Sequence, residues 1–437
     1  MLRIRNRSMK KILKTSILTA LLLAALLLAS CGSSDGQGQT DEVHVHKVIH
    51  WQTVKEADCE SAGRRFGTCI DCKNEVREET AALGHIYSAF GCLRCGAENP
   101  SCGFEFTLNE AKNAYTVTGI SDERMKEAVI PAEYLGLPVT AVGNGAFSGS
   151  SLRSVTLPET VKVIRRHAFS GCTKLESVKL GGGITEICAN AFLGCESLEE
   201  IIMPKSVSVL GEGAFRSCRS LKKAELSDSI MYINEYAFAS CEKLESVNIP
   251  KSCDVIGAHA FYGCGRLSEI ELPESLLVIG DYAFAESGIE AVNFPTRLQS
   301  IGEGAFQGSD LRSVTVYWAS VGTYAFADCL NLESIYYGNW YWISNGRPIG
   351  IGIFSGCVNL KNAEIGDGIV AHGLFSGCSS LEYVKISKDV SAIRTDAFLG
   401  CSSVSVIDYE GTQSKWEMIE KSSGWDRDMG EYTVNFK

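Results

Sequence analysis

The sequence predicts a β-rich solenoid of about twelve rungs, preceded by a small cysteine- and histidine-rich module. The first observation is an Ala-Phe pair, or a close variant, that recurs from about residue 130 onward. The second is the spacing, because most steps between these pairs are 22 or 23 residues and a fixed period of that length is typical of stacked coils. The phenylalanines are Phe147, Phe169, Phe192, Phe215, Phe238, Phe261, Phe284, Phe306, Phe326, Phe354, Phe375 and Phe398.

Each repeat has the same parts, which residues 175–192 illustrate. A short strand comes first, then a Gly or Pro turn, then a second apolar pair and finally the Ala-Phe pair. The apolar positions are Leu175, Val178, Leu180, Ile184, Ile187 and Phe192. One unit cannot bury these side chains alone, but stacked units bury them against each other in a continuous core. With rungs about 4.8 Å apart, twelve of them make a rod on the order of 55 Å long.

Nine cysteines stand three residues after the repeated phenylalanine. Serine takes the same place in the other three units, at Ser150, Ser287 and Ser309. This exchange predicts a small, buried, weakly polar position and argues against obligate pairing. Disulfides between neighbouring rungs stay an alternative, because stacking brings the cysteines near bonding distance. The nine are Cys172, Cys195, Cys218, Cys241, Cys264, Cys329, Cys357, Cys378 and Cys401.

Residues 1–30 predict an export signal. A basic stretch precedes an apolar run, Ile17 to Leu28, that is too short to span a bilayer as a mature helix. The run ends in Leu28-Ala29-Ser30-Cys31, which resembles the bacterial lipobox. That resemblance implies lipidation of Cys31 and anchoring to the outer face of the cell membrane. The alternative is ordinary cleavage near Ser30. Residues 31–43 are rich in Gly and Ser and predict a flexible tether.

Residues 44–102 carry six cysteines and four histidines but few large aliphatic side chains, so cross-links must hold this module together. Its two CxxC pairs, nineteen residues apart, have the spacing of a zinc ribbon and predict structural zinc. One arrangement uses Cys59 with the first pair and a histidine; in another, the two pairs share one metal. Disulfides involving Cys59 or Cys102 are the alternative. The candidate ligands are His50, Cys59, Cys69, Cys72, His85, Cys92 and Cys95.

The pattern LxxVxLPxxVxxIxxxAFxxC, over roughly residues 120–415, resembles the BspA-like leucine-rich repeats of bacterial surface proteins. The module before it resembles the short Cys/His modules of Gram-positive surface proteins. The resemblance implies a solenoid over residues 103–410 and a cap over residues 411–437, which include Trp416. It also implies adhesion or recognition at the cell surface, with an extracellular protein or glycan as partner. We expect a monomer.

Charge and motifs exclude other classes. The net charge is −11, and removal of the six basic residues of the signal leaves 35 basic against 52 acidic residues, a net charge of −17. So acidic a chain is a poor nucleic-acid binder. No nucleophile elbow, P-loop or dinucleotide fingerprint occurs, so we expect no enzyme and no cofactor in the solenoid. His167 and His259 share a register about 19 Å apart, and we expect both to be exposed loop residues. An unrecognised hydrolase and a spacer without a ligand are the rival functions.

One region breaks the rhythm. The spacing falls to 20 residues before Phe326 and rises to 28 before Phe354, and aromatic residues gather there. Irregular loops on a regular scaffold often carry binding, and exposed aromatic rings suit sugars or partner surfaces. Tyr337 occupies an inward strand position and is expected in the core. Exposed rings in this region would favour a binding protein, and buried rings a spacer. The candidate ligand-binding residues are Trp318, Trp340, Tyr341 and Trp342.

Overall fold

The computed structural model describes residues 47–55, 57, 61–71, 73–82, 87–88, 91–92, 103–122, 124–338 and 349–437. The chain divides into two compact units, Met1–Asn99 and Pro100–Lys437, and each is described by itself. No helix within the described ranges is both long enough and apolar enough to cross a bilayer.

The N-terminal unit contains a small antiparallel sheet. Strand β2 (Gly63–Thr68) lies between β1 (Gln52–Lys55) and β3 (Glu75–Thr80), and a separate short hairpin joins β4 (Tyr87–Ser88) to β5 (Gly91–Cys92). Cys69 and Val76 are the buried apolar residues that the structure describes in this unit. So small a core agrees with the expectation that other links stabilise the module.

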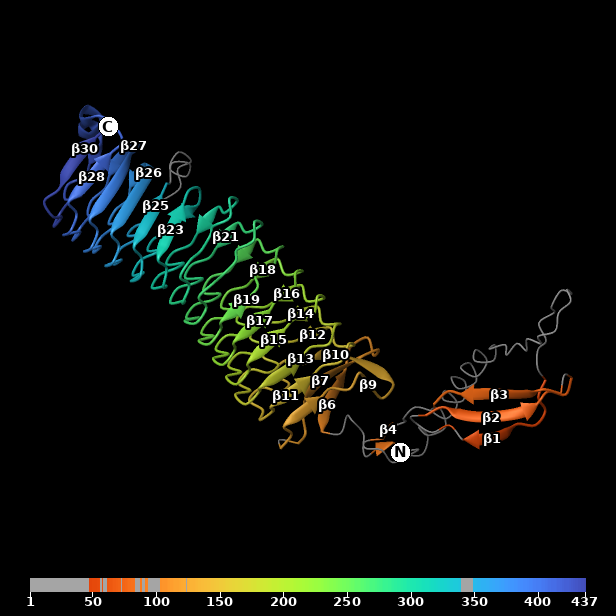
Figure 1. The fold of residues 1–437 in the computed structure, drawn as a ribbon. Helices are drawn as coiled ribbons and strands as arrows, with labels where there is room; N and C mark the ends of the chain where they lie inside the picture. Colours follow the sequence, from red (N-terminus) through yellow and green to blue (C-terminus); the bar gives the residue numbers. More distant parts are fainter. Residues whose placement is uncertain are drawn as a thin grey trace, which may run out of the picture. The chain divides into compact units, whose positions relative to one another are not determined.

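The second unit is a β-solenoid of about 14 turns with a period of about 23 residues, which confirms the predicted fold class (Figure 1). It opens with an antiparallel pair, β6 (Phe104–Leu108) and β7 (Tyr115–Ile120), and a small hairpin of β9 (Glu133–Tyr134) with β10 (Leu137–Val142). From there each turn contributes a strand to one or both of two parallel rows. Because equivalent residues of successive turns pair in register, each inward side chain lies against its equivalent one turn away.

The first row is formed by the strands of the LxxVxL segment, and a single bridge from Glu269 to Ala291 marks it in the middle turns. Its strands are β8 (Glu127–Val129), β11 (Ser154–Thr156), β13 (Ser177–Lys179), β15 (Glu200–Ile202), β17 (Lys223–Glu225), β19 (Ser246–Val247), β23 (Ser313–Val316), β25 (Ser334–Tyr337), β26 (Asn362–Val370), β27 (Tyr383–Ile393), β28 (Val406–Tyr409) and β30 (Thr433–Phe436).

The second row precedes the Ala-Phe pair and starts with β10. It continues through β12 (Val163–Ile164), β14 (Glu186–Ile187), β16 (Val209–Leu210), β18 (Tyr232–Ile233), β20 (Val255–Ile256), β21 (Val278–Ile279), β22 (Ser300–Ile301) and β24 (Ser320–Val321), and ends at β29 (Glu420–Lys421). The long strands β26 and β27 bend and run through both rows, which is why their pairing shows register shifts.

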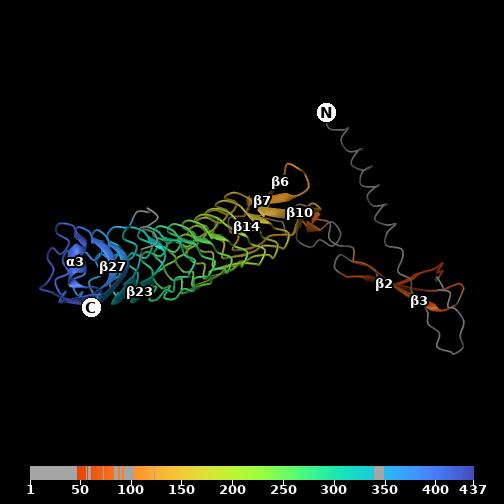
Figure 2. The same cartoon turned by 90° about the horizontal axis from the view of Figure 1, so that it is seen from above.

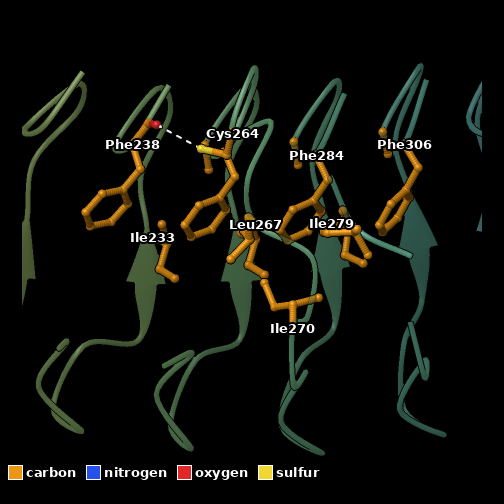
Figure 3. Packing of buried hydrophobic residues seen from close by; sticks show 14 of the residues in the cluster. Ile233, Phe238, Cys264, Leu267, Ile270, Ile279, Phe284 and Phe306 are labelled. Atoms are coloured by element: carbon orange, nitrogen blue, oxygen red, sulfur yellow. Dashed lines mark hydrogen bonds between the residues drawn. The ribbon is translucent and has the colours of Figure 1, made fainter. Parts of the chain in front are cut away.

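The twelve repeated phenylalanines form one unbroken stack inside the coil. Ring centroids of neighbours are 5.0 to 5.9 Å apart, and every ring is buried. Figure 3 shows three of these rings, Phe238, Phe284 and Phe306, pointing the same way between the strands and the upper loops. The backbone follows the same spacing, since the N–H of Phe192 donates to the carbonyl of Ala214 in the next turn at 2.8 Å. The loops are therefore hydrogen-bonded from turn to turn, as the strands are.

The coil has one turn more at each end than the twelve that the phenylalanines mark. The N-terminal turn places Phe104 edge-on against Phe147, with centroids 6.3 Å apart. At the other end Trp425 meets Phe398 edge-on at 5.9 Å. Helix α3 (Gln413–Met418), with Thr412 as its N-cap, lies at the β27 end of the coil (Figure 2). Two perpendicular aromatic rings thus end the parallel stack, and residues 411–437 add strands β29 and β30 as well as a helix.

Candidate ligand-binding surface

Trp318 lies on the surface, in the bend between β23 and β24. Its exposed fraction is 59%, and that of Tyr317 beside it is 51%. The Tyr317 ring is 5.8 Å from Trp318 and 4.8 Å from Tyr336 of the next turn. Burial, together with the nearby carboxylates, raises the pKa of Tyr336, so this phenol stays a hydrogen-bond donor across the physiological range. The three rings form an exposed aromatic patch that crosses two turns.

A cleft of about 220 Å³ lies beside this patch. Phe294 and Leu298 line it from one turn, and Tyr317, Trp318 and Ala319 from the next. The short repeat before Phe326 explains the cleft, because it leaves a tight bend instead of a full loop after β23. Aromatic and aliphatic lining with an open mouth is typical of a site that takes part of a partner molecule.

The neighbouring Tyr337 has the opposite environment. Its exposed fraction is 1%, and its ring meets Phe354 edge-on at 5.8 Å. The prediction that Tyr337 belongs to the core is therefore confirmed. Trp340, Tyr341 and Trp342 lie outside the described residues, and their part in the patch stays a prediction.

The predicted zinc ligands fall mostly outside the described residues. Among those described, His50 is exposed before β1 and Cys69 is buried at the end of β2. The backbone N–H of Cys69 donates to Asn74 and its carbonyl accepts from Lys73, so the first CxxC pair lies in a tight hairpin turn. Cys59, Cys72, His85, Cys95 and the side chain of Cys92 are not described, and neither is the lipidation candidate Cys31.

The nine repeated cysteines are buried thiols. Each Sγ donates to the carbonyl of the phenylalanine one turn earlier, as Cys264 does to Phe238 at 3.3 Å (Figure 3). Ser150 hydrogen-bonds to Cys172, which places serine and cysteine in equivalent positions. Burial raises the pKa of the Cys264 and Cys401 thiols to about 12. A thiol with so high a pKa is a packing group and a hydrogen-bond donor, and a poor nucleophile.

The strand face of the first row carries ion pairs between turns. Arg153 pairs with Glu176 at 3.3 Å, Lys222 with Glu199 at 3.1 Å and Arg312 with Glu290 at 3.0 Å. Each such pair is exposed and contributes little to stability. The pairs do neutralise the carboxylates along this face.

Sequence reasoning missed a second surface feature. His259 is not an exposed loop residue, as expected, but stands half-buried between two tyrosine rings. Its centroid is 4.7 Å from that of Tyr236 and 5.2 Å from that of Tyr282, and these residues come from three successive turns. The three lie at the same position, two residues before the repeated phenylalanine. The signal was in the sequence, since an aromatic residue recurs there in consecutive repeats.

A groove of about 570 Å³ runs along these turns. The aromatic stack lines it together with Tyr262 and Glu286, whose side chains hydrogen-bond at 2.8 Å. That hydrogen bond to a carboxylate raises the pKa of Tyr262. The groove lies on the loop side of the coil, whereas the ion-paired face lies on the strands.

The repeats match a known family. A sequence profile of the BspA type leucine rich repeat region, in six copies, matches residues 140–266, 231–345 and 320–423. Together these spans cover more than half of the chain. No curated protein matches the sequence.

Solved structures share the fold. A leucine-rich repeat protein from Bacteroides ovatus is 23% identical, with a TM-score of 0.52, over 76% of this chain and 98% of its own. The leucine-rich repeat protein of T. pallidum is 36% identical over 43% of this chain and 88% of its own, with a TM-score of 0.42. A leucine-rich cell surface protein from Faecalibacterium prausnitzii is 23% identical over 73% of this chain and 96% of its own, with a TM-score of 0.45. The profile match and the coil of 23-residue turns show that the chain belongs to the BspA-type leucine-rich repeat family.

Proposed function

We propose that this chain is a lipid-anchored cell-surface protein that binds an extracellular protein or glycan through its solenoid. The observation that carries the proposal is the exposed aromatic patch of Tyr317, Trp318 and Tyr336 beside the cleft. Large aromatic side chains at a surface are enriched among residues that dominate binding energy. Many weaker contacts along the stacked turns would add to them.

The exposed rings favour binding over a purely structural role. A spacer needs no exposed tryptophan, and removing an indole ring from solvent against a partner is favourable. The proposed role is non-enzymatic.

The binding test is an array of glycans and extracellular-matrix proteins probed with the full chain. Trp318→Ala should reduce binding at least about tenfold, since an aromatic anchor typically accounts for more than 1.4 kcal/mol. Tyr232→Ala is the matched control, because Tyr232 is 53% exposed on β18, away from the patch. The pair Trp340→Ala and Trp342→Ala tests the rest of the predicted site. Equal binding by all these variants would remove the aromatic patch from the proposal.

Anchoring has its own test. We propose that Cys31 carries the lipid, on the strength of the Leu-Ala-Ser-Cys sequence after the apolar run. Metabolic labelling with a palmitate analogue should mark the chain, and Cys31→Ala should abolish the label and release the protein from the membrane fraction. A labelled Cys31→Ala protein would contradict this assignment.

We also propose structural zinc in the module of residues 44–102, held by ligands from His50, Cys59, Cys69, Cys72, His85, Cys92 and Cys95. The support is the ribbon spacing of the two CxxC pairs. Metal analysis of the purified chain should find zinc, and a chelator should expose reactive thiols there. Protein without metal and without titratable thiols in this module would favour disulfides.

A further inference from the structure

The groove on the loop side is built from two positions of the repeat, and both have unusual backbone geometry. The residue two before the phenylalanine and the residue two after it lie in the left-handed region in the turns around this groove, with φ between +55° and +69°. Side chains other than glycine disfavour this region by about 1–2 kcal/mol per residue. In the N-terminal turns glycine is frequent at these positions, as at Gly145, Gly149, Gly171 and Gly194.

In the groove the sequence departs from that rule. The position before the phenylalanine holds Tyr236, His259 and Tyr282, and the position after it holds Ser240, Glu286 and Asp328, all with positive φ. These six residues make up half of the groove lining. None of the six points into the core, so core packing does not offset the backbone cost. Strained positions that persist without a structural reason mark functional sites.

The aromatic residues form a continuous stack across the turns. The Arg216 guanidinium lies 5.0 Å from the centre of the Tyr236 ring, and His259 and Tyr282 follow. The Tyr282 ring lies over Gly304, where an added Cβ would come within 2.3 Å of a ring carbon. The faces of these rings are thus covered, and only their edges meet the groove. A pyranose needs an open ring face to stack on, so this stack does not suit one.

The groove also has a surplus of hydrogen-bond acceptors. Glu286 accepts from the Tyr262 hydroxyl at 2.8 Å, and Asp328 accepts from the Gln307 amide at 3.1 Å. Neither carboxylate forms an ion pair with a described residue, in contrast to the strand face. The Nδ1 atom of His259, as assigned, is buried without a hydrogen-bond partner. Arg216 is the single cationic residue in the lining, and it already stacks on Tyr236.

We propose that this groove binds arginine or lysine side chains of a basic segment of a partner protein. A guanidinium or ammonium group brings several N–H donors and a positive charge to carboxylates that have no cation of their own. Aromatic rings nearby add cation–π attraction. The groove extends over successive turns, so an extended segment can place more than one cation in it. The proposal rests on the proposed function and narrows the partner to a protein with an exposed basic stretch.

The test uses the full chain and a fluorescein-labelled Gly-Ser-Arg-Gly-Arg-Ser-Gly peptide, with fluorescence polarisation as the readout. A second peptide with citrulline for each arginine keeps the shape and removes the charge. The arginine peptide should bind at least about tenfold more tightly, and its affinity should fall as salt is raised. Equal affinity of the two peptides, or no binding of either, would overturn the proposal.

The groove variant is Glu286→Gly with Asp328→Gly. Glycine occupies this position in other turns, so the fold should stay intact, and peptide binding should weaken about tenfold or more. The pair Glu286→Gln and Asp328→Asn removes the charge at constant size and should act alike. The control is Glu269→Gln with Glu271→Gln, which removes equal charge from exposed residues on the strand side. Equal weakening by this control would show a general charge effect and contradict the site.

The array separates this inference from the proposed function. A partner protein that binds the full chain but not the Glu286→Gly, Asp328→Gly variant supports both. Binding that the groove variant retains and Trp318→Ala loses overturns the groove alone. An array on which the full chain binds nothing overturns the proposed function, whatever the peptide does.

Discussion

The inside and the outside of the same loop follow opposite rules, although they are only two residues apart. The phenylalanine position is the same in all twelve repeats, and its rings stack without a gap. Two residues earlier the side chain varies from glycine to histidine and tyrosine, at one and the same backbone angle. The buried position is set by packing, which every turn shares. The outer position has no packing demand, so departures from glycine there report what the surface is used for.

The largest effect should come from the inner position. Phe261→Ala removes a ring from the middle of the stack and leaves a cavity between two neighbours, which should cost about 3–5 kcal/mol of unfolding free energy. Urea unfolding followed by circular dichroism measures it. A loss below about 1 kcal/mol would mean that the stack is not the main support of the coil.

The cysteine beside the stack gives a pH-dependent test. Burial raises the pKa of Cys264 to about 12, whereas an unfolded thiol titrates near about 8.5. The folded state therefore keeps a proton that the unfolded state loses, and stability should fall as pH rises from about 9 toward 12. Urea unfolding at several alkaline pH values should show this decline, and Cys264→Ser should make it shallower at a cost of about 1 kcal/mol at neutral pH. An unchanged slope in the variant would assign the decline to other groups.

The outer position should respond in the other direction. Glu286→Gly relieves a left-handed residue, so unfolding free energy should stay the same or rise by up to about 1 kcal/mol. Its counterpart is Gly308→Ala one turn further on, which should cost about 1 kcal/mol because the space is open and only the backbone objects. A destabilised Glu286→Gly protein would make this side chain structural and weaken the comparison.

The smallest effect on stability should come from the aromatic patch. Trp318→Ala removes an exposed ring and should change unfolding free energy by less than about 0.5 kcal/mol. The melting temperature of the variant measures this. A large loss would show that Trp318 packs against its surroundings and is not held ready for a partner.

The coil and its core were readable from the sequence, whereas much of the surface was not. Leu175, Ile184 and Ile187 are buried as predicted, because one coil repeats the same demand at each step. The end turns were harder to predict, since Phe104 and Trp425 replace the Ala-Phe pair with a perpendicular ring. Trp318 was expected to be a binding residue, and it is exposed. His259 was interpreted wrongly, because its environment comes from neighbours 23 residues away on either side.

By itself the sequence determined the period, the inward residues and the family, because burial in a stacked coil imposes one pattern on every turn and a repeated pattern is visible without coordinates. Only the tertiary structure decided that two outer positions are left-handed, that Tyr236, His259 and Tyr282 stack, and that Glu286 and Asp328 face a groove without a cation. Those facts depend on how side chains of successive turns meet outside the core, where no shared packing rule makes them repeat.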